Sequence, residues 1–163
     1  AHHPDASTGL VLALVDPSFR NLAGPPSLES CTRDVYGDEA RWSAETALRM
    51  ARGIASAIAR LHARGILHGD LYGHNILWNG RGDALLGDFG AASFLPRDDA
   101  AQSQALQRTE ARAFGCLLEE LAARCEAPDA ATGALPAGLQ ARCLDDDPAE
   151  RPLFDEIAAA LGT

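Results

Sequence analysis

The chain has 163 residues, of which 47% are hydrophobic, which is enough for the core of one globular domain. A net charge of −9 disfavours contact with nucleic-acid phosphates, and no apolar stretch approaches the roughly 20 residues that cross a bilayer. The four cysteines lack C-x-x-C spacing and are expected to be reduced thiols. The composition therefore predicts a cytoplasmic protein without a nucleic-acid or membrane partner.

The N-terminal part of the chain combines one apolar run with a long polar segment. Residues 9–15, "GLVLALV", have the length and composition of a buried strand that Asp16 and Pro17 end. Residues 18–38 contain paired prolines and scattered polar residues, which predicts a loop. A loop of about twenty residues is uncommon in a compact domain, so it is expected to serve function or to pack against another body.

Helical patterns dominate the rest of the chain. Ser43 can cap a helix that runs to a stop near Gly65, because apolar residues recur behind it at spacings of three and four. A second helix is expected from about Thr109 to Cys125, after a polar stretch over residues 97–107. Two shorter helices are expected over residues 136–144 and 153–161. The sequence thus predicts a mainly helical domain.

A small β-hairpin interrupts the helices and carries the polar residues of greatest interest. Residues 75–78 and 84–86 are short apolar runs joined by the turn-rich "NGRGD". Asp70 precedes the first run, Asn75 enters it and Asp88 follows the second, so the hairpin should bring all three to one end. Carboxylate and amide oxygens suit Mg²⁺, and a free carboxylate can orient a hydroxyl. Each residue alone could be a turn or cap residue, but their order favours a functional site.

Four segments of the chain carry a family resemblance. "HGDLYGHNIL" (68–77) and "GDFG" (87–90) resemble the catalytic and metal-binding loops of the protein kinase family. "RAFGCLLEEL" (112–121) and "DDPAERPLFDEI" (146–157) resemble the central helix and the end of the kinase large lobe. The resemblance implies a kinase-like C-lobe over residues 18–163, a helical bundle with a small catalytic β-hairpin. Residues 1–17 would be the last strand of the small lobe and the hinge, and the rest of that lobe would lie upstream.

The resemblance also implies roles for individual residues. Asp70 would be the catalytic base that orients the acceptor hydroxyl, and Asn75 and Asp88 would hold Mg²⁺ on the phosphates of ATP. His68 would be structural and pack beneath Phe89.

Three further residues would contact the adenine of ATP. The backbone of Ala13 and Val15 would hydrogen-bond the base, and Leu77 would form an apolar floor for its ring. All three also have a purely structural interpretation as strand and hairpin core.

The activity implied is an ATP-dependent protein kinase acting on a protein hydroxyl, Ser/Thr rather than Tyr, and inactive as an isolated lobe. The residue 19–36 insert and "EARAFG" are similar to bacterial kinases joined to leucine-rich repeats. Two alternatives stay open. Aminoglycoside and choline kinases share H-G-D-x-x-x-x-N, and a non-catalytic kinase-like scaffold would explain the departures from the family pattern.

Three of those departures concern the catalytic loop. Gly69 replaces an Arg that pairs with a phosphorylated activation loop, so activation by loop phosphorylation is not expected. Tyr72 replaces a Lys that neutralises the transferring phosphoryl group, and His74 is the nearest substitute. Glu110 replaces an Asp that braces the loop, and it is expected to accept a hydrogen bond from the amides near His68 or Gly69.

Overall fold

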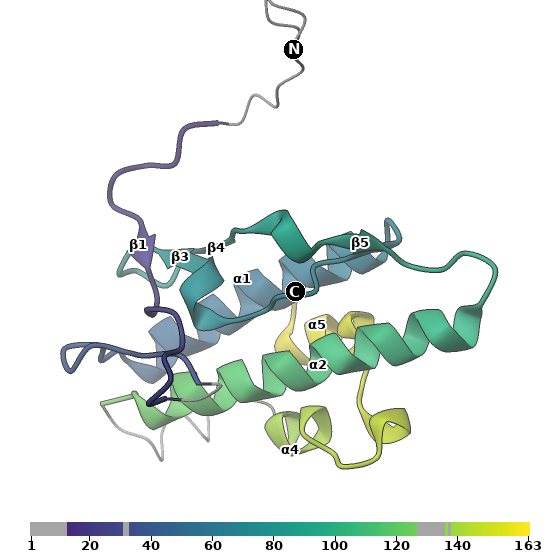
Figure 1. The fold of residues 1–163 in the computed structure, drawn as a ribbon. Helices are drawn as coiled ribbons and strands as arrows, with labels where there is room; N and C mark the ends of the chain where they lie inside the picture. The colour runs from purple at the N-terminus through teal and green to yellow at the C-terminus, as the bar shows by residue number, and fades with distance from the viewer. Residues whose placement is uncertain (1–12, 31–32, 127–135, 137) are drawn as a thin grey trace, which may run out of the picture.

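The computed structural model describes residues 13–30, 33–126, 136 and 138–163. Its described α-helices are α1 (Ala44–His62), α2 (Ala100–Ala123), α4 (Leu139–Cys143) and α5 (Phe154–Leu161). Figure 1 shows short strands on one side of α1 and α2, with α4 on the opposite side. The mainly helical architecture predicted from the sequence is therefore confirmed.

Helix α1 forms where the sequence predicts it. The Ser43 side chain caps it by accepting a hydrogen bond from the Thr46 amide at 3.1 Å. Its apolar stripe is buried, since Ala51, Ile54 and Ile58 are each at most 1% exposed. This stripe faces α2, α5 and the hairpin, and α1 is thus the centre of the core.

Helix α2 begins at Ala100, well before the predicted start near Thr109, so that prediction is wrong at its N-terminal end. Asp99 caps the helix by accepting a hydrogen bond from the Gln102 amide at 2.9 Å. The first turns are mostly exposed and bury no apolar stripe, which removes the periodic signal that locates a helix in sequence. From Glu110 onward the helix is buried along one face that includes Phe114 and Leu118.

The predicted hairpin is confirmed. Strands β3 (Ile76–Trp78) and β4 (Ala84–Leu86) pair antiparallel, with Ile76 opposite Leu86. Strand β1 (Arg20–Asn21) adds to the free edge of β3, and β2 (Ile66–Leu67) pairs with β5 (Ser93–Phe94). Neither β1 nor β5 is predicted, because each is two residues long and depends on a partner distant in sequence.

The predicted N-terminal strand is not found where the structure can test it. Residues 13–15 form no strand and Leu14 is 98% exposed, while residues 9–12 lie outside the described part. A strand needs a hydrogen-bonded neighbour, and no described segment pairs with this one. The loop predicted after it closes on itself through backbone hydrogen bonds between Gly24 and Val35 of 2.7 and 3.1 Å.

The C-terminal helices differ slightly from prediction. Helix α4 starts at Leu139 rather than at Pro136, because Gly138 precedes it in the left-handed region with φ 73°. Helix α5 matches its prediction to within a residue. Among the described residues, no helix combines the length and apolar character that a membrane span requires.

Candidate active site

Asp70 and Asn75 are in direct contact at the entrance to the hairpin. Asn75 Nδ2 donates to Asp70 Oδ2 and to the Asp70 backbone carbonyl, both at 2.9 Å. A short 3-10 turn over Gly73–Asn75 leads into β3 and leaves Asn75 only 8% exposed. Neither Asp70 Oδ1 nor Asn75 Oδ1 has a hydrogen-bond partner among the described residues, so each can receive a ligand.

Asp88 lies at the same end of the hairpin, where β4 ends. The Gly87 amide donates to the Asn75 carbonyl at 2.8 Å, which extends the pairing to the residue before Asp88. Asp88 has a positive φ of 47°, which Asp tolerates better than most residues, and its Oδ1 accepts a hydrogen bond from the Gly90 amide at 3.0 Å. The hairpin thus brings Asp70, Asn75 and Asp88 to one end, as the sequence predicts.

His68 has a structural role in this site. It is fully buried, and its ring packs edge-on against Phe89 with centroids 4.9 Å apart, which confirms the predicted packing. Its Nε2 lies 2.8 Å from the Gly87 carbonyl, which can only accept, so Nε2 carries the hydrogen. Nδ1 then accepts a hydrogen bond from the Asp70 amide at 3.3 Å. His68 therefore ties the loop before Asp70 to the segment before Asp88.

Glu110, on α2, holds the loop that precedes Asp70. Its side chain is 3% exposed, and Oε1 accepts a hydrogen bond from the Gly69 amide at 2.8 Å, as predicted. Oε2 lies 2.6 Å from His62 Nε2 at the end of α1. Because a carboxylate only accepts, His62 Nε2 is the donor, and His62 Nδ1 stays buried without a partner among the described residues. One carboxylate thus links α1, α2 and the loop.

The structure explains why Gly69 stands where many kinases have Arg. Its φ is 83°, a conformation that side-chain-bearing residues rarely adopt. A Cβ at this position would lie 2.7 Å from the Ala91 carbonyl oxygen, too close for any real contact. No arginine can be accommodated here without moving the segment after Asp88.

A second carboxylate, which sequence reasoning missed, holds the loop from the other side. Asp34, whose side chain is fully buried, accepts hydrogen bonds from the His74 amide at 3.1 Å and from His74 Nδ1 at 2.7 Å. The His74 ring stacks on Tyr72 with centroids 5.6 Å apart. Gly73 lets Asp34 come this close to the loop, since a Cβ at Gly73 would lie 3.0 Å from Asp34 Oδ2 and 2.6 Å from the Tyr36 hydroxyl. The only signal in the sequence is the unusual length of the loop that carries Asp34.

The residues expected to contact adenine are not gathered in one place. Leu77 is half-buried in β3, opposite Leu85 of β4 and Asn21 of β1. Ala13 and Val15 are exposed, and Figure 1 shows their segment extending away from the helices before β1. Leu77 is thus part of the hairpin, whereas Ala13 and Val15 lie away from it.

The donor atoms at this end of the hairpin fit a hard divalent cation. Asn75 supplies a free Oδ1, and Asp88 keeps one carboxylate oxygen that accepts no hydrogen bond from the described residues. Among those residues, no three His, Cys, Asp or Glu side chains form a closed metal site. Mg²⁺ is typically held by one or two protein oxygen donors, and water and phosphate oxygens fill its remaining coordination positions.

Comparison with known proteins identifies the family. A family profile described as "Protein kinase domain" matches residues 26–110, just over half of the chain. The Serine/threonine/tyrosine-protein kinase HT1 of Arabidopsis thaliana is 25% identical over an alignment 156 residues long, and the match covers 73% of this chain and 40% of that protein. The Serine/threonine-protein kinase US3 homolog of bovine herpesvirus 1.2 is 49% identical over 47 residues, covering 29% of this chain and 10% of that protein. The chain spans well under two thirds of the length of these relatives.

The matched region contains the hydrogen-bonded Asp70–Asn75 pair, Asp88 and the bracing Glu110. The helical fold around the hairpin is the one expected of the large lobe of such a domain. The chain belongs to the protein kinase family.

Proposed function

We propose that this chain is the large-lobe part of an ATP-dependent protein kinase that transfers the γ-phosphoryl group to a serine or threonine hydroxyl of a protein. The observation that carries the proposal is the contact between Asp70 and Asn75, with Nδ2 to Oδ2 at 2.9 Å, beside the end of β4 that bears Asp88. A structural protein has no need to keep a free carboxylate oxygen next to a free amide oxygen at this place. A phosphotransferase needs both.

The proposed chemistry assigns one task to each of the three side chains. Asp70 Oδ1 accepts a hydrogen bond from the acceptor hydroxyl and takes its proton as the oxygen attacks phosphorus. Asn75 fixes the orientation of the Asp70 carboxylate, and Asn75 Oδ1 and Asp88 would hold Mg²⁺. When bound, ATP would supply the phosphoryl group and ADP would leave as its bond to the γ-phosphorus breaks, while Mg²⁺ would neutralise the phosphate charge.

The nucleotide site would be completed by a separate small lobe. Leu85 and Phe89 line one hollow beside the hairpin and are 42% and 51% exposed, which supports a second folded unit covering this face. Ala13 and Val15 would contact adenine only once that unit places their segment. On motif resemblance alone, the proposal extends to a cytoplasmic, bacterial kinase joined to leucine-rich repeats, and the isolated lobe is expected to be inactive.

Two other functions are each favoured by one observation. The neutral Tyr72, which stacks on His74 where a lysine would bring charge, favours a non-catalytic scaffold. The sterically required Gly69 favours a small-molecule phosphotransferase of the aminoglycoside or choline type. Mg²⁺–ATP should raise the melting temperature of the protein containing this chain if it is an enzyme, and should leave it unchanged for a scaffold. Transfer to peptides rather than to aminoglycosides or choline separates the two enzymes.

The decisive experiment replaces the proposed base in the protein that contains this chain. Asp70→Asn keeps the size of the side chain and should reduce transfer to a peptide by about 10²–10⁴-fold, with an unchanged melting temperature. Asp38→Asn, at an exposed carboxylate outside the site, is the matched control and should leave the rate unchanged. Full activity in Asp70→Asn would refute the proposed role.

A further inference from the structure

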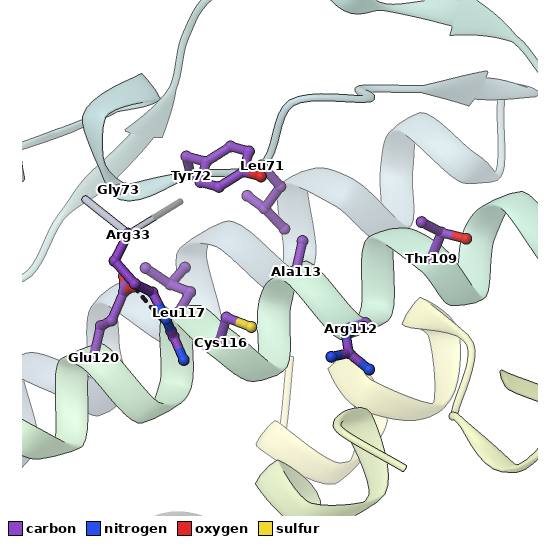
Figure 2. A pocket seen from close by; sticks show the side chains of 10 residues that line it. All are labelled: Arg33, Leu71, Tyr72, Gly73, Thr109, Arg112, Ala113, Cys116, Leu117 and Glu120. Atoms are coloured by element: carbon purple, nitrogen blue, oxygen red, sulfur yellow. Dashed lines mark hydrogen bonds and ion pairs between the residues drawn. The ribbon is translucent and has the colours of Figure 1, made fainter. Parts of the chain in front are cut away.

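A groove lies directly beside the proposed catalytic loop. It is a hollow of about 450 Å³ between Leu71–Gly73 and the exposed side of α2 (Figure 2). A smaller hollow of about 190 Å³ shares Leu71, Tyr72, Thr109 and Ala113 with it and reaches Gly69, the neighbour of Asp70. The two hollows adjoin along α2, and together they are called the trough; its smaller part reaches the residue before the proposed base.

The floor of the groove is apolar. Leu71 and Leu117 are 3% and 2% exposed, and Ala113 lies on α2 one turn before Leu117, below Leu71 in the view of Figure 2. Tyr72 forms the opposite rim and keeps 41% of its surface exposed. Such a surface can bury the apolar parts of an extended peptide and exclude water around one polar contact.

The charged side chains of the groove differ in whether they are paired. At one end Arg33 is paired with Glu119 at 2.7 Å and with Glu120 at 3.2 Å, and Glu120 also accepts a hydrogen bond from the Tyr36 hydroxyl at 2.9 Å. Arg112 is exposed at the rim and makes no hydrogen bond or ion pair with any described residue. In the smaller hollow, Glu110 is held by His62 and the Gly69 amide. Of the charged side chains that line the two hollows, Arg112 alone therefore has no partner among the described residues. The complementary ligand carries a carboxylate.

We propose that this groove binds the acceptor segment of the protein substrate, and that Arg112 selects an aspartate or glutamate side chain near the acceptor hydroxyl. The inference rests on the proposed function and adds a substrate preference to it. A segment lying in the trough passes Leu71–Gly73 and so brings its hydroxyl beside Asp70, which precedes them in the chain. Its carboxylate can pair with two of the three guanidinium nitrogens of Arg112, a geometry that lysine cannot reproduce.

A charge-swap experiment on the protein containing this chain tests the proposal. Serine peptides that differ only in carrying Asp, Ala or Lys at each position flanking the serine are compared by kcat/KM. For the unmodified protein, Asp at one position should be preferred over Lys by about two- to fivefold, the range typical of an exposed ion pair. Arg112→Glu should reverse this order, while Arg41→Glu, at an exposed arginine outside the groove, should preserve it.

A binding measurement that does not depend on turnover accompanies the kinetics. Cys116 lines the groove and is partly exposed, so alkylation of its thiol reports on occupancy (Figure 2). The Asp peptide should slow the alkylation in the unmodified protein, and the Lys peptide should slow it in Arg112→Glu.

The outcomes separate the two proposals. Phosphorylation without an acidic preference, and with no reversal in Arg112→Glu, overturns the groove proposal and leaves the proposed function standing. If no peptide is phosphorylated and Mg²⁺–ATP causes no thermal shift, the proposed function fails, and the alkylation data alone decide whether the groove binds acidic peptides. Protection of Cys116 that rises with protein concentration and without peptide would assign the groove to a second copy of the chain and overturn the proposal.

Discussion

Removal of the Glu110 carboxylate should destabilise the protein far more than an ordinary glutamate substitution. In Glu110→Ala the Gly69 amide and His62 Nε2 both lose their partner inside the core, where the carboxylate is 3% exposed. Each unsatisfied buried group costs about 1–3 kcal/mol, so the expected loss is about 2–6 kcal/mol. Domains of this size have about 5–15 kcal/mol in total, so this variant approaches the limit of folding.

Urea unfolding followed by circular dichroism measures this loss. With a slope of about 2 kcal/mol per molar urea, the midpoint should fall by about 1–3 M. Glu110→Gln keeps an acceptor for the Gly69 amide, but it places an NH2 donor against His62 Nε2, which can accept only if the ring proton moves to Nδ1. This variant should therefore cost about 1–2 kcal/mol, less than Glu110→Ala. Hydrogen exchange at the Gly69 amide should become fast in Glu110→Ala and stay slow in Glu110→Gln.

The same helix offers a matched control. The side chain of Glu119 is 47% exposed and pairs with Arg33, so Glu119→Ala should cost less than about 1 kcal/mol. If Glu110→Ala shifted the midpoint no more than Glu119→Ala, the inference that Glu110 holds the catalytic loop would be wrong.

Two further predictions concern a glycine and a buried thiol. Gly69→Ala should destabilise more than Gly65→Ala in urea unfolding: both positions have positive φ, but only a Cβ at Gly69 meets backbone, 2.7 Å away, whereas nothing lies within 4 Å at Gly65. Gly65→Ala should cost about 1–2 kcal/mol, and an equal cost at both sites would contradict the steric argument. Burial raises the pKa of the Cys143 thiol from 9.0 to about 12, so its contribution to stability is full below pH 9 and is lost as the pH rises toward 12. The stability difference between the unmodified protein and Cys143→Ala should therefore narrow by at most about 1.4 kcal/mol per pH unit above pH 9, and a constant difference between pH 8 and pH 10.5 would refute this.

Signals between residues close together in the chain were sufficient to predict α1, the hairpin and the grouping of the proposed site residues. The stripe of α1 and its Ser43 cap, the turn-rich hairpin and the order of Asp70, Asn75 and Asp88 all depend on residues close together in the chain, and the structure contains them. The extended start of α2 escaped prediction because its first turns face solvent on most sides. A helix end held by one capping Asp99 leaves no periodic pattern to read.

Contacts between distant segments were mostly beyond the reach of the sequence. Glu110 was predicted to reach the loop only because the family resemblance gives its position a partner. Asp34 lies 40 residues before His74 in a loop without periodicity, and nothing in its neighbours indicates a buried carboxylate. Strand β1 likewise exists only because it finds the edge of β3.

The two glycines of the catalytic loop restrict its evolution at two positions, whereas the residue between them is not restricted in this way. At Gly69 an added methyl would collide with Ala91, and at Gly73 it would collide with the Tyr36 hydroxyl, so neither position can change unless a second segment changes with it. Tyr72 lies between them with its side chain partly in solvent and meets no such barrier. Descendants of this sequence can therefore exchange the side chain at position 72 by a single substitution, while Gly69 and Gly73 on either side of it stay fixed.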